Sequence, residues 1–491
     1  MPAAPLPSRF GRLLALGLLA AALVSCRASD QTLVEPTSTT TPEPTTTTST
    51  APPTGEAGEP GVGDPYFPEL GNGGYDVASY HIDLEWLPDA GAIDAVTTIE
   101  LTPTVALDTF NLDLVGLDVS SVTVVGEEAP FTRAGRELTV DPEPVLAAGE
   151  PVEVVVTYAG VPQPISLGSD VFGAGWQTTG RDAYVVSEPA GAATWFPAND
   201  HPTDKAQFTF ELTVPADQIA VANGVLVEEQ TESDGRRTST WVASDQMATY
   251  LASIAVGDLV IEGATAPTGL ALRDAYPPQH ADQARELFAR TGEMVATFEE
   301  WFGPYPFEVY GHVVVDEVLG FALENQTLSL FGIDLLGTGA AGERTVAHEL
   351  AHQWFGNAVS PATWRDIWLN EGFATYAEWI WLEEAYGQPI ASSAERAHAG
   401  ADYGVAPGDP GNEELFQPTV YIRGGLALHA LSVAMGDEAF RTLLREWAQR
   451  FDDSTASTED LRALAEELSG QDLGPLFEAW VYGAALPPFP T

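Results

Sequence analysis

Two histidines and a glutamate in the segment HELAHQWFG, residues 348–356, have types and a spacing that suit metal chemistry. On a helix, residues i and i+4 lie one above the other, so His348 and His352 turn to the same side. Both imidazoles could then bind one zinc ion, and Glu349 could take a proton from a water beside it. The same pattern fits an amphipathic helix with a solvated polar face, so the surrounding sequence has to decide.

A catalytic zinc ion needs a third protein ligand and an open coordination position for water. The segment WLNEGFATYAEW supplies Glu371, with 18 residues between it and His352. Its aromatic neighbours predict a buried helix that crosses the first one. Two histidines and a carboxylate therefore predict a zinc hydrolase, in which the zinc polarises a carbonyl group and Glu349 is the general base.

HExxH followed 18 residues later by the glutamate of an NEGFA segment resembles the gluzincins of the aminopeptidase N and leukotriene-hydrolase family. GFALENQ at 320–326 resembles the Gly-x-Met-Glu-Asn exopeptidase motif of that family, with Phe321 at the first glycine and Leu323 at the methionine. The resemblance implies that Glu324 and Asn325 bind the substrate and that Glu324 holds its free α-amine. A fixed carboxylate here would pair with an ammonium and set the register at the N-terminal residue.

Two further segments carry the same resemblance. TVYIRGGLALHAL at 419–431 is similar to the Tyr-x-Lys-Gly segment of the family, and implies that Tyr421 donates a hydrogen bond to the tetrahedral oxyanion. WQTTG places Gln177 where the family has a glutamine that lines the pocket for the first side chain. Many members have an acidic or amide residue two positions later, where this chain has Thr179. Either the alignment slips here, or amine recognition relies more heavily on Glu324.

The elements that position these motifs are expected to form two domains, as a length of 491 residues suggests. Short runs with alternating apolar residues predict an all-β sandwich or saddle over residues 71–263. In this part, Asp200 and Lys205 predict an ion pair between loops. Helical periodicity follows, and residues 264–491 are expected to form a mainly α-helical zinc catalytic domain, which the resemblance identifies as thermolysin-like. The expected fold class is α+β and multidomain.

The C-terminal part contains one clear helix start and one expected absence. Ser457 precedes two acidic residues and a run with helical periodicity, which predicts that a helix begins there. Longer members of the family add a small β domain and a large helical domain that caps the active site. We expect no such C-terminal capping domain here.

The first residues have the pattern of an export signal. A positively charged start precedes an apolar run over residues 13–24 that is too short to span a bilayer. The segment LVSC resembles the bacterial lipobox, so residues 1–25 predict a lipoprotein signal peptide and Cys26 a lipidated N-terminus. Residues 26–70 are rich in Thr and Pro and predict a disordered tether. The expected location is outside the cytoplasm, anchored to the membrane by the lipid.

The net charge of −51 comes from 20 basic and 71 acidic residues and makes nucleic acid a poor partner. It indicates a solvated acidic surface or, as the alternative, a cleft that attracts cations. We expect one zinc ion per chain and, as substrates, peptides with a free N-terminus. The alternatives are an endopeptidase or epoxide hydrolase of the same fold and, from another class, a non-catalytic surface-binding protein.

Overall fold

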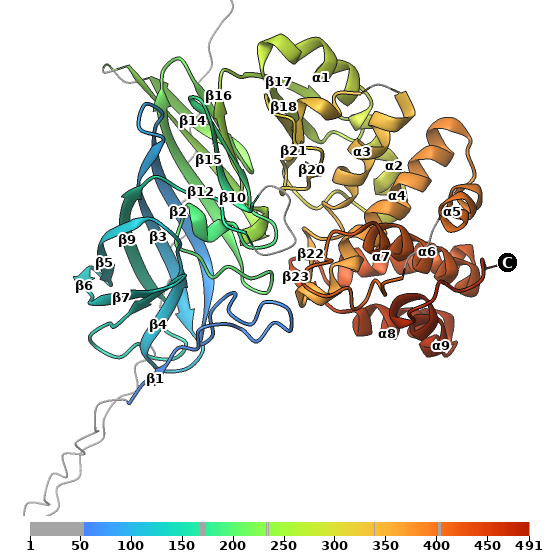
Figure 1. The fold of residues 1–491 in the computed structure, drawn as a ribbon, viewed down its shortest axis with the longest axis horizontal. Coiled ribbons are helices and arrows are strands. Elements are labelled where there is room, and N and C mark those ends of the chain that lie inside the picture. The colour runs from blue at the N-terminus through green and yellow to red at the C-terminus, as the bar shows by residue number, and fades with distance from the viewer. Residues whose placement is uncertain are drawn as a thin grey trace, which may run out of the picture. The chain divides into compact units, whose positions relative to one another are not determined.

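The computed structural model describes residues 54–166, 173–231, 233, 235–337, 339–400 and 404–490. A β-rich half extends to Gly257, and a mainly helical half follows from Val260 (Figure 1). This order confirms the predicted α+β fold, in which an all-β domain precedes a mainly α-helical one. The predicted signal peptide and Cys26 lie outside the described residues, as does the first part of the predicted tether.

The largest sheet of the β-rich half has eight strands in the order β14-β15-β12-β2-β3-β9-β5-β6. Its strands β12 and β2 run parallel, and its other described neighbours are antiparallel. Successive side chains point to opposite faces of a strand, and in β2 the apolar Ile82, Leu84 and Trp86 are buried while their neighbours are more exposed. The strands are β2 (Tyr75–Leu87), β3 (Ala92–Pro103), β5 (Asp118–Val124), β6 (Glu127–Glu128), β9 (Val152–Gly160), β12 (Lys205–Pro215), β14 (Val225–Thr231) and β15 (Arg236–Ala248).

Two four-stranded sheets complete the described β-rich half, in the orders β1-β4-β8-β7 and β10-β11-β16-β13. Aromatic side chains fill its core, where the ring of Tyr80 stacks on Phe208 with centroids 5.0 Å apart and meets Phe196 edge-on at 5.4 Å. The strands are β1 (Glu56–Ala57), β4 (Leu107–Asp113), β7 (Phe131–Ala134), β8 (Glu137–Val140), β10 (Gly175–Thr179), β11 (Asp182–Val186), β13 (Ile219–Ala222) and β16 (Ile254–Gly257), with the short helices η1 (Ala192–Thr194) and η2 (Thr249–Leu251).

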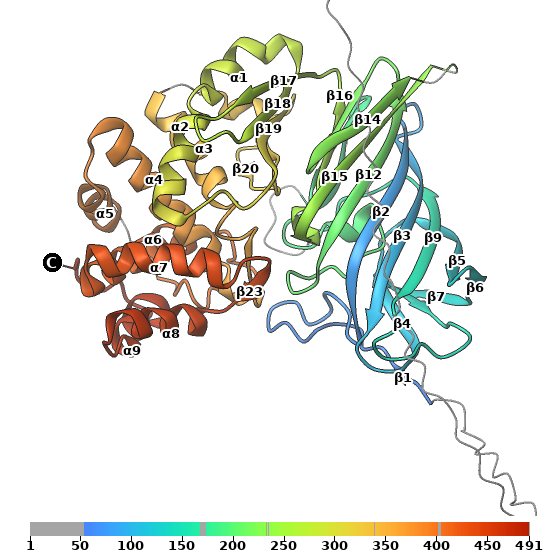
Figure 2. The same ribbon diagram turned by 180° about the vertical axis from the view of Figure 1, so that it is seen from behind.

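The helical half contains a five-stranded mixed sheet in the order β17-β18-β19-β21-β20 (Figure 2). Its edge strand β20 pairs antiparallel with β21. The strands are β17 (Val260–Thr265), β18 (Ala271–Tyr276), β19 (Val309–Val315), β20 (Ala322–Leu323) and β21 (Ser329–Gly332), and β22 (Val359–Pro361) pairs with β23 (Ser454–Ala456).

The helices of this half are mostly amphipathic or buried, and one confirms its predicted start. Ser457 caps α8, since its side chain accepts a hydrogen bond from Asp460 N while the Asp460 carboxylate accepts one from Ser457 N. The helices are α1 (Ala281–Phe288), α2 (Thr291–Phe302), α3 (Gly339–Ala351), α4 (Trp368–Tyr386), α5 (Ile390–Ala399), α6 (Pro418–Met435), α7 (Asp437–Arg450), α8 (Thr458–Ser469) and α9 (Gly474–Phe477), with the short η3 (Pro278–His280), η4 (Ile333–Leu335), η5 (Trp364–Asp366) and η6 (Glu478–Tyr482).

The prediction of a disordered tether over residues 26–70 is wrong for residues 54–70. Strand β1 pairs with β4, and Leu70 is buried. Asp64 is also buried, and its carboxylate accepts a hydrogen bond of 2.8 Å from the backbone N–H of Trp364 in the helical half. A composition rich in Gly and Pro predicts disorder because it offers few apolar contacts, but hydrogen bonds to the backbone order this segment.

The predicted domain boundary after residue 263 falls inside β17. This strand pairs with β18, so it belongs to the sheet of the helical half, which begins at Val260. The sequence of β17, VIEGAT, shows no alternation in burial, and sequence periodicity does not indicate which sheet a strand joins.

Helices α4 and α6 cross at a pair of glycines. A Cβ atom built on Gly372 would lie 2.9 Å from the carbonyl carbon of Gly424, and one built on Gly424 would lie 2.9 Å from Gly372 Cα. Only glycine lets two helix backbones approach this closely. Gly372 directly follows Glu371, and Gly424 lies almost one turn after Tyr421, so the close crossing brings these two side chains to the same place.

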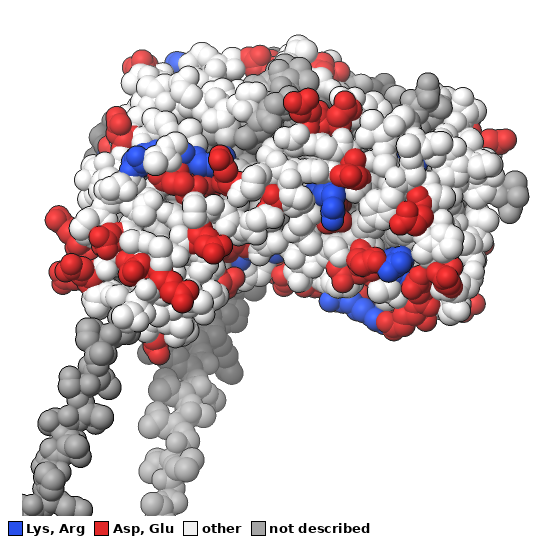
Figure 3. Space-filling view, turned by 60° about the horizontal axis from the view of Figure 1, so that its bottom comes forward, with Lys and Arg blue, Asp and Glu red and all other residues white. Residues whose placement is uncertain are grey.

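Acidic side chains are spread over the face seen in Figure 3, and basic side chains there are few. Several arginines form exposed ion pairs with this excess of acid, as Arg285 does with Glu262 and Arg450 with Glu467. The distribution supports the interpretation of a solvated acidic surface. Within the described part of the chain, no helix is both long and apolar enough to cross a membrane.

Candidate active site

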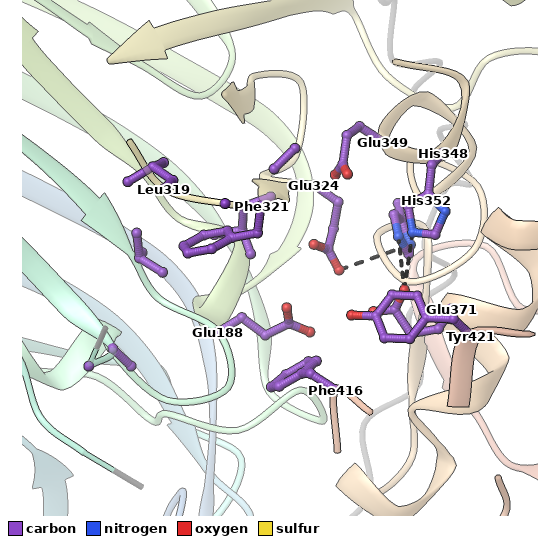
Figure 4. Close-up of a pocket in the computed structure, with 16 residues that line it drawn as sticks. Glu188, Leu319, Phe321, Glu324, His348, Glu349, His352, Glu371, Phe416 and Tyr421 are labelled. Atoms are coloured by element: carbon purple, nitrogen blue, oxygen red, sulfur yellow. Dashed lines mark hydrogen bonds and ion pairs between the residues drawn. The ribbon is translucent and has the colours of Figure 1, made fainter. Parts of the chain in front are cut away.

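A cavity of about 550 Å³ lies where α3 and β20 of the helical half face residues of the β-rich half (Figure 4). Its described lining combines apolar side chains with a dense group of ionisable ones: Glu188, Glu324, His348, Glu349, His352, Glu371 and Tyr421. The cavity therefore brings together six of the residues that the sequence singles out, together with Glu188, which the sequence analysis missed.

The three predicted zinc ligands converge at one end of this cavity. His348 lies in the last turn of α3, His352 directly follows that helix, and Glu371 lies in the first turn of α4. Glu371 Oε2 is 3.2 Å from His348 Nε2 and 3.6 Å from His352 Nε2. One donor atom from each residue lies within 4.8 Å of the others, which is the arrangement of a cation site.

Hydrogen bonds at the far side of each ring orient the two histidines. His352 Nδ1 lies 3.1 Å from Phe355 O, and a carbonyl oxygen can only accept, so Nδ1 carries the proton. His348 Nδ1 lies 3.0 Å from Glu378 Oε1, which Arg344 holds in place. Both Nε2 atoms therefore turn toward Glu371, where a metal ion could replace the proton that His348 shares with this carboxylate.

The electrostatics of these three side chains also fit a divalent cation. Burial alone would raise the pKa of Glu371, but the neighbouring His352 and His348 lower it to about 2. Burial alone would lower the pKa of His348, but its hydrogen bonds to Glu371 and Glu378 hold that pKa well above its usual value. Carboxylate and imidazole thus attract positive charge to one point, and two histidines with one carboxylate form a common ligand set of catalytic zinc.

Glu349 faces the cavity beside these ligands (Figure 4). Its Oε2 is buried and makes no hydrogen bond to the described residues. Burial, with the nearby carboxylates, raises the pKa of Glu349 to about 8 despite the two histidines. A carboxylate with a raised pKa and an unused oxygen suits the predicted role of general base toward a water.

Tyr421 lies across from Glu349, near the start of α6. Its ring stacks on His348 with centroids 5.8 Å apart. Burial, together with the carboxylates that surround it, raises the pKa of Tyr421 well above its usual value, so the phenol keeps its proton. The structure therefore places a neutral O–H donor at the zinc end of the cavity, as the sequence predicts.

Two carboxylates form the other polar end of the cavity. Glu324 follows the edge strand β20 and Glu188 follows β11, so they come from different halves of the chain. Glu188, Glu324 and Glu371 each place one carboxylate oxygen within 4.8 Å of the others. Burial, and then mutual repulsion, raises the pKa of Glu188 well above its usual value, and burial raises that of Glu324.

The prediction that Gln177 lines the cavity is wrong. Its side-chain amide donates a hydrogen bond to Gly173 O at 3.0 Å and thereby supports the loop that borders the cavity. Thr179 is exposed at the end of β10. The β-rich half supplies Glu188 to the cavity as the second acidic residue that was expected at Thr179. This supports the alternative that the alignment slips in this segment.

Only one weak signal in the sequence pointed to Glu188. It follows the apolar run AYVV after a single serine, and a buried acid next to such a run is costly without a partner.

Asn325 does not line the cavity either. Its side chain is fully buried and makes no hydrogen bond within the described residues. Both residues directly follow β20, and of the two only Glu324 lines the cavity.

The predicted ion pair between Asp200 and Lys205 does not form. Asp200 pairs with Arg136 and accepts a hydrogen bond from Thr249 Oγ1. Lys205 instead donates to backbone carbonyl groups of the helical half.

Comparisons with known proteins match both halves of the chain to one family of peptidases. The family models described as "Peptidase M1 N-terminal domain" and "Peptidase family M1 domain" match residues 77–251 and 287–480. Aminopeptidase M1 of Arabidopsis thaliana is 30% identical over 323 residues, which cover 61% of this chain and 36% of that protein. The puromycin-sensitive aminopeptidase of Caenorhabditis elegans is 28% identical over 335 residues, which cover 63% of this chain and 35% of that protein. The chain thus spans little more than a third of the length of these relatives.

Solved structures match over more of their length. The M1 zinc metallopeptidase from Deinococcus radiodurans is 33% identical, with a TM-score of 0.81, and the match covers 88% of this chain and 99% of that one. A mutant of that protein, bound to a Tyr-Ser-Ala substrate, matches with a TM-score of 0.79 and 33% identity over 88% of this chain and 99% of the other. The two family models and the shared fold agree, and the chain belongs to the M1 family of zinc metallopeptidases.

Proposed function

We propose that this chain is an aminopeptidase, which hydrolyses the first peptide bond of peptides with a free N-terminus. The observation that carries the proposal is the pair of carboxylates Glu188 and Glu324 beside the zinc ligands. Both side chains are more than nine-tenths buried, and Oε1 of each makes no hydrogen bond within the described residues. Two close carboxylates in a buried place repel each other, and a cation between them relieves that repulsion.

The α-ammonium of a peptide suits this place. An ammonium has three N–H donors and a positive charge, so it can satisfy both carboxylates at once. A blocked N-terminus has neither the charge nor the donors and would leave Glu188 and Glu324 uncompensated. Because these carboxylates lie next to Glu371, the peptide bond nearest to the zinc site would be the first one.

The reaction divides among few side chains. When bound by His348, His352 and Glu371, zinc polarises the scissile carbonyl group and lowers the pKa of a water. Glu349 takes the proton of the attacking water and can pass it to the leaving amine. Tyr421 donates a hydrogen bond to the oxyanion as negative charge develops on it.

We further propose that the preferred first residue is apolar. Away from its carboxylates, the described lining consists of apolar side chains and glycines, among them Val186, Leu319, Phe321 and Phe416. Phe321 and Phe416 flank Glu188 in Figure 4, so a side chain next to the bound ammonium would meet aromatic rings. Burying an apolar side chain there is favourable, and burying a second charge is not.

Two hydrolysis measurements test these proposals. Aminoacyl-coumarins with Leu, Phe or Met are expected to be cleaved with a kcat/KM at least about tenfold above those with Asp or Lys. A peptide with a free N-terminus is expected to be cleaved, and its N-acetylated form is not. Comparable cleavage of both forms would favour the endopeptidase alternative, and hydrolysis of an epoxide but not of peptides would favour the other hydrolase.

We also propose that the chain is exported and held at the membrane by lipid on Cys26. The support is the sequence alone: an apolar run with a charged start, followed by LVSC and a Thr/Pro-rich segment. Expression of the full chain in a bacterial host should give a membrane-bound protein that incorporates labelled fatty acid. Cys26→Ser should release it from the membrane fraction, and unchanged fractionation would contradict the proposal.

A further inference from the structure

Lys205 is the only lysine in the chain and lies at the start of β12. It is only 8% exposed, and its ammonium donates hydrogen bonds of 2.8 Å to both Asn357 O and Ala358 O. Asp452 and Asp453 attract it through space. An ammonium is costly to bury when its near neighbours are uncharged carbonyl groups. A lysine at this place therefore needs an explanation that packing does not give.

The two carbonyl groups belong to the loop that follows the zinc ligand His352. Asn357 N donates to His352 O at 3.0 Å, and the side-chain amide of Asn357 donates to Glu324 O at 2.7 Å. Hydrogen bonds thus join Asn357 to the zinc ligand His352, to Glu324 and to Lys205. A shift of this one residue would move Glu324 relative to the zinc ligands.

Other side chains of the β-rich half reinforce the same region. Tyr250 Oη donates to Gly356 O at 2.9 Å, and Asn223 Nδ2 donates to Gln326 O at 2.6 Å. Each of these two side chains donates to one carbonyl group of the region, whereas Lys205 donates to two consecutive ones, at residues 357 and 358. Lys205 therefore holds this part of the loop at two points.

We propose that Lys205 is a positioning residue for amine recognition: it fixes the loop at residues 356–358, and Asn357 in turn fixes Glu324 at its distance from the zinc ligands. The inference rests on the proposed function, because it assumes that Glu324 binds an amine. It adds that the β-rich half sets the geometry of the amine site through the only lysine of the chain.

Two inhibitors separate this role from a purely structural one. Leucine hydroxamate offers both a metal-binding group and a free amine, whereas acetohydroxamate offers the metal-binding group alone. In the zinc-loaded full chain, Lys205→Met is expected to raise the inhibition constant of leucine hydroxamate by about tenfold. The inhibition constant of acetohydroxamate should rise by less than about twofold. Zinc content should stay at one ion per chain, and Lys205→Arg should restore most of the loss because it keeps N–H donors for the two carbonyl groups.

A matched control comes from the β-rich half. Arg133 also donates to two backbone carbonyl groups, those of Leu114 and Leu117, and none of these residues lines the cavity. Arg133→Met removes the same kind of contact and should leave both inhibition constants unchanged. Asn357→Ala gives a second route if Lys205→Met does not fold, because it removes the shorter of the two side-chain amide bonds to Glu324 O, the other coming from Gln353, and keeps the backbone acceptors of Lys205. It should show the same selective loss.

Each outcome decides between the alternatives. A selective loss of leucine hydroxamate binding supports the positioning role. An equal loss for both inhibitors, loss of zinc, or unchanged constants for both would overturn it. If the wild-type chain binds both hydroxamates equally well, the amine site itself is wrong, and the proposed function fails before the role of Lys205 is tested.

Discussion

The zinc end and the amine end of the cavity are built in different ways. The zinc ligands and Glu349 lie on α3, directly after it, and on the neighbouring α4 of one half, and the glycine contact between α4 and α6 brings Tyr421 to Glu371. The two carboxylates of the amine end follow strands in different halves of the chain, Glu188 after β11 and Glu324 after β20. Local geometry therefore defines the zinc end, whereas the amine end depends on how the two halves meet.

The largest expected effect breaks the zinc end without touching the amine end. Glu349→Gln keeps the size of the side chain but removes the general base, so kcat is expected to fall by about 10²- to 10⁴-fold. Zinc content, measured by elemental analysis, and inhibition by leucine hydroxamate should change little. A variant that keeps more than about a tenth of the wild-type turnover would remove Glu349 from the role of base.

The next largest effect breaks the amine end alone. Glu188→Gln and Glu324→Gln each leave the ammonium with one carboxylate, and each is expected to lower kcat/KM for a free peptide by about 100-fold. The double variant should lose most of the preference for free over N-acetylated peptides.

Acetohydroxamate inhibition provides the control for these two substitutions, because it reports the zinc end only. It should be unchanged in both single variants. If either substitution also weakens acetohydroxamate or releases zinc, the two ends are not separate and the comparison fails.

Sequence reasoning found the zinc end because its geometry is local. The i, i+4 spacing of His348 and His352 fixes their relation on any helix, and Glu371 and Tyr421 are recognised by the motifs around them. The helix start at Ser457 is local in the same sense, because the cap and its partner lie three residues apart.

The amine end could not be found in the same way. The sequence prediction chose Gln177 for the cavity and missed Glu188. The pairing of β10 with β11 and the contacts between the halves decide which side chain reaches the cavity. For the same reason β17 joined a different sheet from the one its position predicted, and residues 54–70 became ordered by partners such as Trp364, far along the chain. Periodicity and composition carry no information about such distant partners.

A smaller effect sharpens the description of the zinc end. Glu378 holds His348 by its Nδ1, so Glu378→Gln should weaken zinc binding by about 10- to 100-fold, which competition with a chelator measures. Once the variant is loaded with zinc, its KM for a free peptide should change by less than about twofold. A raised KM with unchanged zinc affinity would place Glu378 with the amine end instead.

The smallest effect concerns the contact between the halves and depends on pH. Burial lowers the pKa of Lys205 from 10.5 to about 7, so between these values the unfolded chain binds the proton and the folded chain does not. Stability from this group is therefore present above about pH 10.5 and is lost as the pH falls toward 7.

Relative to Lys205→Met, the free energy of unfolding of the wild-type chain should rise by at least about 1 kcal/mol between pH 7 and 10. Chemical unfolding of both at several pH values measures this difference, and Arg133→Met should show no such slope because arginine stays charged. A difference that does not change with pH would mean that the ammonium keeps its charge in the folded chain, held there by the carbonyl groups of Asn357 and Ala358.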